Sequence, residues 1–287
     1  MARPAVLVIA ATDSSGGAGL TRDVRVLSDF SVDALCVVTA VTAQSDKKVT
    51  AVHHVPPEVI RAQIAAALVT RQVGAIKIGM LGNRATVEAV VEGLRADGSL
   101  RGKVAPGSWP SEDLAAGGSS PSGSLRGGSL LREGPSHGIP IVVDPVLVST
   151  SGGVLLDAGG RAALTEALFP LAALVTPNVP EAAALLGEAL ATDEAELVQQ
   201  GLRLLGFGSR AILLKGGHTH GEEAVDLLLS GDRTIERIAS QRVAATSRGT
   251  GCALASAIAA GLAAGKPLNE ASRAAKNYVL EMLTPVN

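Results

Sequence analysis

The chain has 287 residues, of which 47% are hydrophobic and 2% aromatic, and its net charge is -2 with a pI near 6.2. This content is sufficient for the core of one large or two small domains and excludes a disordered chain. The balanced charge and the scarcity of aromatic rings argue against binding to nucleic acid or to an anionic membrane, because both need a concentrated basic face. No uncharged stretch of about 20 apolar residues, the length that spans a bilayer, appears in the sequence.

Short apolar runs rich in Val, Ile and Leu recur along the chain and predict strands. Because these runs are continuous rather than alternating, they indicate strands buried on both faces, as in a parallel sheet covered by helices. The expected strands are Ala5–Ala11, Leu35–Val41, Ala75–Ile78, Ile139–Val143, Ala173–Thr176 and Ala211–Leu214. Near the end of the chain, Ala224–Leu229 and Arg233–Val243 flank the turn residues Gly231-Asp232 and predict an antiparallel pair at the sheet edge.

Segments with apolar residues at helical spacing lie between these runs. In the segment Pro57–Arg71, Pro57 suits a helix start, and the apolar residues Ile60 and Ile64 lie four residues apart. The expected helices are Leu20–Phe30, Pro57–Arg71, Asn83–Leu94, Pro180–Leu186, Glu194–Leu205, Thr250–Ala264 and Glu270–Leu283. The alternation of strand and helix predicts a single α/β domain, residues 1–287, with right-handed crossovers.

One segment interrupts this alternation. Residues 97–138 contain ten Gly, nine Ser and four Pro and have neither a helical nor a strand period. Such a composition buries too little apolar surface to offset the entropy of ordering, so we expect a flexible surface insertion.

The two cysteines, Cys36 and Cys252, are too few for a disulfide framework or a four-thiolate metal site. They suit a reducing compartment, so the cytosol is the expected location. Because Cys36 lies inside an apolar strand, we expect it to be an inert core thiol.

A glycine-rich turn, Asp13 to Gly19, follows the first strand and precedes the first helix. This is the carboxyl end of a strand, where open α/β sheets bind ligands. Arg22 stands where a dinucleotide fingerprint needs its third glycine, which argues against a nicotinamide-dependent oxidoreductase. A tight turn that uses glycine for positive φ explains the same residues.

A second glycine turn, Gly249-Thr250-Gly251, leads into a helix that starts beside Cys252. Backbone N–H groups at a helix start have no intrahelical acceptor and lie at the positive end of the helix dipole. They form an anion site, so this turn predicts a phosphate held next to Cys252.

Polar side chains follow three further strands. Asp144 ends one strand, Asn178 and Glu181 follow another, and Lys215 ends a third with Gly216-Gly217 after it. Asn178 and Glu181 suit either a helix capping box or the water shell of Mg²⁺, which needs only one or two carboxylates beside a nucleotide. Lys215 suits either a phosphate clamp or a solvated lysine before a turn.

Taken together, these segments resemble the ribokinase-like superfamily and, within it, the hydroxymethylpyrimidine/phosphomethylpyrimidine kinases of thiamine biosynthesis. The resemblance spans the chain except the insertion. It rests on ordered motifs: Asp13-Ser-Ser-Gly-Gly-Ala-Gly19 with Asp23, Thr39-Ala-Val-Thr-Ala-Gln44, Lys77-Ile-Gly-Met-Leu81, Val142-Val-Asp-Pro-Val146, Thr176-Pro-Asn-Val-Pro-Glu181, Leu214-Lys-Gly-Gly-His218 and Gly249-Thr-Gly-Cys252.

The resemblance implies a three-layer α/β/α fold with a mostly parallel sheet, often dimeric, that transfers the γ-phosphoryl group of MgATP to 4-amino-5-hydroxymethyl-2-methylpyrimidine and to its monophosphate. It also implies roles for individual residues of this chain. The pyrimidine pocket would contain Ala11, Asp23, Gln44, Met80 and Val146; the nucleotide would contact Lys215, Gly217 and Thr176; Asp144, Asn178 and Glu181 would serve Mg²⁺; and Cys252 with Gly249, Thr250 and Gly251 would form the catalytic group.

Cys252 stands where most sugar kinases of the superfamily have an aspartate base, as it does in the pyrimidine kinases. A helix start lowers the pKa of a thiol, so we expect Cys252 to accept the hydroxyl proton. Two positions depart from the pattern that the resemblance implies: Ala11 replaces a glycine beside the substrate, and Thr150 replaces a lysine.

Two alternatives remain. A pyridoxal or pyridoxine kinase acts on a similar ring and hydroxymethyl group, although Gln44 and Met80 favour the aminopyrimidine. A non-catalytic pyrimidine-binding regulatory protein would use the same pocket, although Asp144, Glu181, Lys215 and Cys252 argue against it.

Overall fold

The computed structural model describes residues 2–96, 138–149, 152–216, 222–231, 235–243 and 247–284. Apart from residue 138, the expected insertion at 97–138 lies outside these residues, as do Thr150 and Gly217. Among the described residues, no helix has the length and apolar character needed to cross a membrane.

The centre of the described structure is an eight-stranded sheet in the order β10-β9-β8-β7-β6-β5-β1-β2. Its strands are β1 (Ala5–Ala10), β2 (Asp33–Val38), β5 (Ala75–Ile78), β6 (Ile141–Val143), β7 (Leu174–Val175), β8 (Ala211–Lys215), β9 (Glu223–Ser230) and β10 (Ile235–Gln241). Neighbouring strands from β2 to β8 pair in parallel, whereas β9 pairs antiparallel with both β8 and β10. The predicted parallel sheet and its antiparallel edge pair are confirmed.

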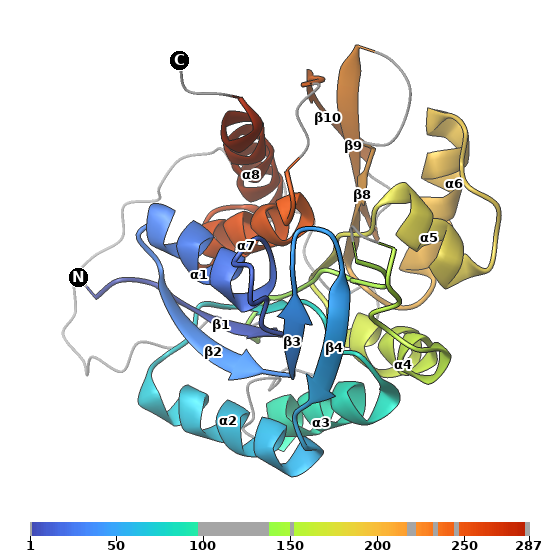
Figure 1. Cartoon of the computed structure of the whole chain (residues 1–287). Coiled ribbons are helices and arrows are strands. Elements are labelled where there is room, and N and C mark those ends of the chain that lie inside the picture. The colour runs from blue at the N-terminus through green and yellow to red at the C-terminus, as the bar shows by residue number, and fades with distance from the viewer. Residues whose placement is uncertain are drawn as a thin grey trace.

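Helices cover both faces of the sheet (Figure 1). On one face lie α1 (Gly19–Asp29), α7 (Thr250–Ala263) and α8 (Leu268–Leu283); on the other lie α2 (Pro57–Thr70), α3 (Arg84–Ala96), α4 (Ala158–Ala163), α5 (Val179–Leu186) and α6 (Glu194–Leu205). Along β1, Val6 and Val8 pack in the core with α1 and α7, and Leu7 and Ile9 pack in the core with α2 and α3. This alternation, with both faces buried, gives the expected three-layer α/β/α fold.

The expected strand Leu35–Val41 is wrong in its second half. The chain leaves the sheet after Val38, and β3 (Ala40–Gln44) pairs with β4 (Val49–His54) in a separate hairpin beside the end of β1 (Figure 1). Thr39 fixes the crossing, because its N–H donates to Ala10 O and its hydroxyl donates to Met80 O at 2.7 Å. A polar residue inside an apolar run therefore marks the bend.

Cys36 is exposed, so its prediction as a core thiol is wrong. It lies opposite Val8 in register, but β2 is the last strand of the sheet and has a neighbour on one side only. A strand at an edge keeps part of its side-chain surface in solvent even when its sequence is as apolar as that of a central strand.

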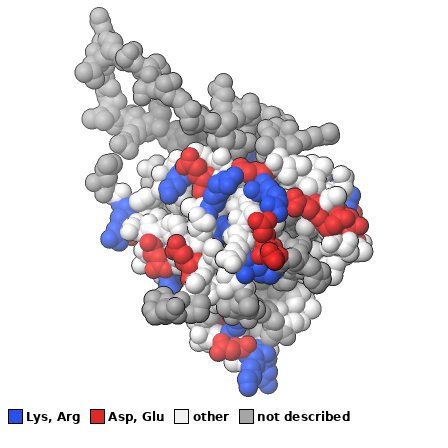
Figure 2. All heavy atoms as spheres, turned by 90° about the horizontal axis from the view of Figure 1, so that it is seen from above, with Lys and Arg blue, Asp and Glu red and all other residues white. Residues whose placement is uncertain are grey.

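Charged side chains of both signs are interspersed on the face seen in Figure 2. This distribution agrees with the net charge of -2. The described residues on that face form no continuous basic patch of the kind that binds a polyanion.

Candidate active site

The carboxyl ends of the parallel strands meet at one edge of the sheet and carry most of the predicted site residues. Ala11 follows β1, Met80 follows β5, Asp144 follows β6, Thr176 follows β7, and Lys215 is the last residue of β8. Parallel neighbours end at the same edge, so residues far apart in the sequence lie together there.

A small apolar cluster forms the first part of this site. Ala11 and Met80 pack with Ala40 and Leu155 in one buried cluster, and Val146 packs against it. Three of the five residues predicted to contact the substrate are therefore brought together. Leu155 was not predicted, because the pattern around it gives no strand or helix signal.

Gln44 lies at the end of β3, half-buried, above the glycine turn that follows β1. Its backbone N–H donates to Ser14 Oγ at 2.8 Å, and the Ser14 hydroxyl donates back to its carbonyl at 2.7 Å. The side-chain oxygen accepts a bond from Thr42 Oγ1 at 3.4 Å. These bonds hold the hairpin against the turn and fix the position of the Gln44 backbone, from which the side-chain amide extends.

Asp23 has a different environment from the other predicted substrate residues. It is 0% exposed, and its two carboxylate oxygens accept hydrogen bonds from Lys77 Nζ and Ser256 Oγ, each at 2.8 Å. Burial raises the pKa of Asp23, and the charge of Lys77 opposes that rise. Its carboxylate therefore contacts protein groups beneath the site and does not belong to the apolar cluster.

The second glycine turn starts α7 as expected, with Gly249 as the N-cap at φ 75°. A Cβ on Gly249 would collide with the carbonyl of Gly17, so the two glycine turns are in contact. A Cβ on Gly251 would lie 3.2 Å from Lys215 Nζ and 3.5 Å from Asp144 Oδ2. The start of α7 therefore lies directly against the charged groups that end β6 and β8.

Burial raises the pKa of the Cys252 thiol to about 11, although the charge of Lys77 and a hydrogen bond from the Gly19 backbone oppose the rise. The carboxylates of Asp23 and Asp144 raise this pKa further. The expected lowering by the helix start is therefore wrong for the protein without ligands, because desolvation of the thiolate outweighs the N–H groups and the lysine.

Lys215 joins two acidic side chains of the site. Its Nζ lies 2.9 Å from Asp144 Oδ1 and 3.7 Å from Glu181 Oε2, and Thr176 Oγ1 donates to the same Asp144 oxygen at 3.2 Å. Burial acts to raise the pKa of Asp144, but Lys215 and Lys77 together hold it below its usual range. Burial raises the pKa of Glu181 despite Lys215.

Asn178 and Glu181 form the capping box at the start of α5. Asn178 Oδ1 accepts from the Glu181 N–H, and Glu181 Oε2 accepts from the Asn178 N–H, both at 2.8 Å. The capping interpretation of these two residues is thus confirmed. It does not exclude the metal, because the same Glu181 oxygen also faces Lys215.

The donor set fits Mg²⁺ bound together with a nucleotide. The described residues contain no cluster of three or more His, Cys, Asp or Glu that could hold a metal by itself. Asp144 and Glu181 nevertheless lie close enough to share one cation, the ammonium of Lys215. Mg²⁺ takes oxygen ligands, keeps several waters and commonly binds through one or two carboxylates and substrate phosphates.

Arg248 has a structural position that the sequence pattern did not indicate. Its guanidinium contacts Asp13 Oδ2 at 3.1 Å, Ser15 Oγ at 2.8 Å and Asp46 Oδ1 at 2.8 Å. These partners come from the first glycine turn and from the tip of the β3-β4 hairpin. Arg248 therefore ties both segments to the loop that precedes α7.

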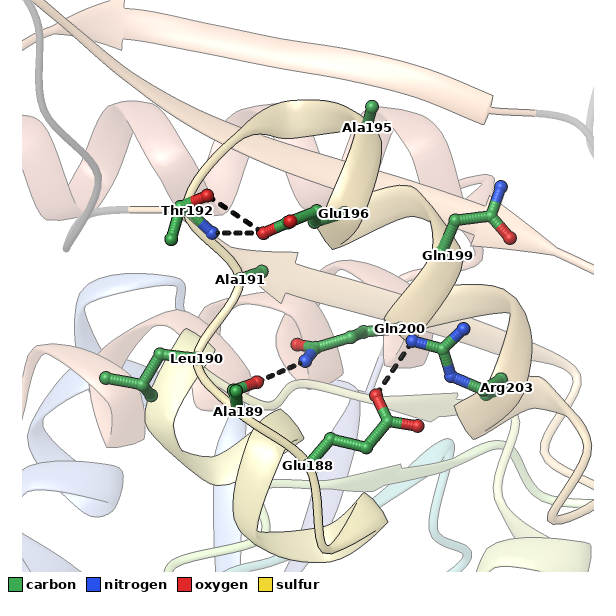
Figure 3. Close-up of a pocket in the computed structure, with 10 residues that line it drawn as sticks. All are labelled: Glu188, Ala189, Leu190, Ala191, Thr192, Ala195, Glu196, Gln199, Gln200 and Arg203. Atoms are coloured by element: carbon green, nitrogen blue, oxygen red, sulfur yellow. Dashed lines mark hydrogen bonds and ion pairs between the residues drawn. The ribbon is translucent and has the colours of Figure 1, made fainter.

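A pocket of about 520 Å³ lies away from these residues, at the end of α5 and along α6 (Figure 3). Its lining includes Gln200, which donates to Ala189 O at 2.8 Å, and the ion pair Glu188–Arg203 at 2.7 Å. None of the predicted site residues lines it. The candidate active site is therefore defined by the strand ends and the start of α7.

Comparisons with known proteins agree with this arrangement. A family model described as phosphomethylpyrimidine kinase matches residues 13–104 and 130–286. A hydroxymethylpyrimidine/phosphomethylpyrimidine kinase of Rhizobium meliloti is 40% identical over 273 residues, which cover 95% of this chain and 88% of that protein. The internal gap in this match, residues 105–129, lies within the Gly/Ser/Pro-rich stretch.

Solved structures give the same result. The phosphomethylpyrimidine kinase of Clostridium difficile 630 superposes with a TM-score of 0.74 at 30% identity, covering 98% of this chain and 100% of that one. The pyridoxal kinase of Staphylococcus aureus in complex with AMP-PCP and pyridoxal superposes with a TM-score of 0.76 at 25% identity, covering 98% of this chain and 87% of that one. With the matched motifs at the strand ends, these similarities establish that the chain belongs to the phosphomethylpyrimidine kinase family.

Proposed function

We propose that this protein transfers the γ-phosphoryl group of ATP to the hydroxymethyl oxygen of 4-amino-5-hydroxymethyl-2-methylpyrimidine, and then phosphorylates the monophosphate to the diphosphate used in thiamine biosynthesis. The observation that carries the proposal is the contact between the start of α7 and the Asp144–Lys215 pair. A phosphoryl group placed there would meet backbone N–H donors and a lysine from two sides. Family membership supports the same reaction.

The apolar cluster provides a surface for the pyrimidine ring. Ala11 and Met80 belong to this buried cluster, and Val146 packs against it. The Gln44 amide carries both donors and an acceptor, which suits an aminopyrimidine edge. We assign these four residues to substrate binding, with Asp23 acting from beneath the site.

The protein's part in the transfer is positioning and electrostatic stabilisation. The N–H groups of residues 249–251 hold the transferring oxygens, and Lys215, with Thr176 and Gly217, approaches the nucleotide phosphates. Asp144, Glu181 and Asn178 would hold Mg²⁺, which would supply positive charge to neutralise the phosphates. Cys252 receives the proton of the hydroxyl group that attacks phosphorus.

The raised pKa of Cys252 determines how this base works. At neutral pH the thiol is protonated in most molecules, since its pKa lies at about 11 without ligands. Phosphoryl transfer has a loose transition state, in which positioning matters more than a strong base. Loss of Cys252 is therefore expected to cost less activity than loss of the anion site at residues 249–251.

The proposal is tested by steady-state kinetics of ATP consumption with purified protein and Mg²⁺. Hydroxymethylpyrimidine, its monophosphate and pyridoxal are supplied separately. We expect kcat/KM to be highest for the two pyrimidines. Turnover of neither pyrimidine would reject the proposal.

Pyridoxal phosphorylation is the second candidate, because the structure resembles a pyridoxal kinase solved with pyridoxal and AMP-PCP. The two rings have similar size and both carry a hydroxymethyl group. A kcat/KM for pyridoxal above that for the pyrimidines would instead assign the protein to vitamin B6 metabolism. Pyrimidine binding without any turnover would instead support a regulatory binding protein.

We further propose that the protein acts as a cytosolic homodimer. The two cysteines remain free in the structure, which suits a reducing compartment. Light scattering coupled to size-exclusion chromatography would give the mass in solution. A mass near 28.9 kDa, that of one chain, would reject the dimer.

A further inference from the structure

A buried ion pair lies beneath the start of α7, and the proposed transfer gives its lysine no role. It joins Lys77 of β5 to Asp23 of α1, both 0% exposed, with 2.8 Å between Nζ and Oδ2. Desolvation offsets much of the attraction in such a pair, and a well-packed apolar pair of similar size is often as stable. Stability alone therefore gives little reason to bury these two charges here.

A hydrogen bond connects α1 to α7 at this place, because Ser256 Oγ of α7 donates to Asp23 Oδ1 of α1 at 2.8 Å. Ser256 follows Cys252 by four residues in α7. Residues four apart lie on the same helix face, so Asp23 and its partner Lys77 lie about one helical turn beneath the thiol.

The ammonium of Lys77 is also confined from the side of its own strand. A Cβ on Gly79 would lie 2.8 Å from Nζ and 3.2 Å from the Ala10 side chain. The Lys77 side chain therefore fills the space beside Gly79, and its ion pair with Asp23 fixes the direction in which the ammonium points. This arrangement gives the ammonium one position relative to α7.

Four charged groups influence Cys252, one from each neighbouring element: Lys77 of β5, Asp23 of α1, Asp144 after β6 and Lys215 of β8. After burial, which raises the pKa of Cys252, Lys77 is the largest influence and lowers it. The carboxylates of Asp23 and Asp144 act in the opposite direction with smaller effect. Lys77 is thus the charge that most favours the thiolate.

We propose that the Lys77–Asp23 pair positions a charge for Cys252, and this inference rests on the proposed kinase function. The ammonium of Lys77 favours the thiolate, and Asp23 with Ser256 holds the ammonium in place. In the transfer, the thiolate form of Cys252 accepts the proton, so the O–H bond of the substrate breaks and an S–H bond forms. The oxygen's electron pair forms the new O–P bond. The P–O bond to ADP breaks, and its electrons remain on ADP.

The test measures the thiol itself, without nucleotide. In a Cys36→Ser background Cys252 is the only thiol, since the chain has two cysteines. The rate of alkylation by iodoacetamide is followed by mass spectrometry as a function of pH. We expect Lys77→Met to raise the midpoint above the wild-type value of about 11, seen as alkylation that is roughly tenfold slower or more at a fixed pH below it, and to lower kcat with little change in the KM for ATP.

Lys276→Met is the matched control. It breaks another buried ion pair, Lys276–Asp226, with 2.9 Å between its charged atoms, and should leave the midpoint unchanged. If Lys77→Met does not fold, Lys77→Met/Asp23→Asn buries no charge and should still raise the midpoint, by a smaller amount.

An unchanged midpoint in a folded variant, or an equal shift with Lys276→Met, would overturn the role of the pair. Because alkylation needs no ATP, a wild-type protein without kinase activity would overturn the proposed function alone.

Discussion

Lys215 Nζ lies 2.9 Å from Asp144 Oδ1, although 71 residues separate the two side chains in the sequence. The pair forms because β6 and β8 run parallel on either side of β7 and end at the same sheet edge. Gly251 at the start of α7 lies against it. A lysine, a carboxylate and free helix N–H groups thereby meet at one point, which is the arrangement that phosphoryl transfer requires.

Gly251→Ala should reduce kcat/KM by roughly 100-fold, because the added methyl group would lie 3.2 Å from Lys215 Nζ and displace the helix start from the phosphate. Initial rates of ADP formation check this. Gly159→Ala in α4 is the control, since its Cβ meets its neighbours at 3.5 Å or more. Equal activity of the two variants would contradict the close approach at Gly251.

Lys215→Met should reduce kcat by about 100-fold to 1,000-fold, the usual loss for one stabilising group at a developing charge. The variant also leaves Asp144 and Glu181 facing each other without their shared ammonium. A rise in the KM for ATP is expected to accompany the loss. A kcat within threefold of wild type would exclude Lys215 from the transfer.

The pH dependence of kcat/KM should follow Cys252. A base acts in its deprotonated form, and burial raises the pKa of this thiol to about 11, so the rate should increase with pH through the neutral range and on toward that value. Cys252→Ala should lose less rate than Gly251→Ala, because positioning matters more than a strong base, and it should also lose the slope. A slope that persists in Cys252→Ala would assign the ionisation to another group.

Removal of divalent cations with EDTA should abolish turnover and leave the far-UV circular dichroism unchanged, because apolar clusters pack the sheet against its helices. Asp144→Asn should then require a higher Mg²⁺ concentration for half-maximal activity than wild type. Titration of Mg²⁺ at fixed ATP measures both effects. An unchanged Mg²⁺ requirement would remove Asp144 from the metal site.

Arg248→Gln should lower the free energy of unfolding by about 3 kcal/mol, because it leaves the buried carboxylate of Asp13 without its charged partner. Arg273→Gln breaks an ion pair whose arginine is 57% exposed and should cost less than about 1 kcal/mol. Urea unfolding of both variants checks the difference. Equal losses of unfolding free energy in the two variants would show that the ion pair of Arg248 stabilises the fold no more than an exposed ion pair does.

Much of the fold follows from local sequence patterns. Continuous apolar runs located the central strands within one or two residues, because burial on both faces leaves few polar positions. The hairpin did not follow, since the bend at Thr39 depends on hydrogen bonds to Ala10 and Met80, which lie in other segments. The exposure of Cys36 depends on which strand forms the edge, and that is a property of the whole sheet.

The site was predictable where its residues end strands or start helices, and less so where they meet in space. Asp144, Lys215 and Cys252 were identified from such positions. Asp23 was expected in the pocket, yet Lys77 and Ser256 bind both of its oxygens. The signal that was overlooked is Lys77 itself, since a lysine inside a buried apolar strand needs a buried partner.

The central claim is transfer of phosphate from ATP to a hydroxymethylpyrimidine, and phosphorus NMR of the reaction mixture tests it most directly. With wild-type protein, Mg²⁺, ATP and 4-amino-5-hydroxymethyl-2-methylpyrimidine, we predict ADP and a phosphomonoester signal, followed by the signals of a diphosphate ester. An unchanged ATP spectrum, or ADP that appears with free phosphate and no ester, would contradict the account.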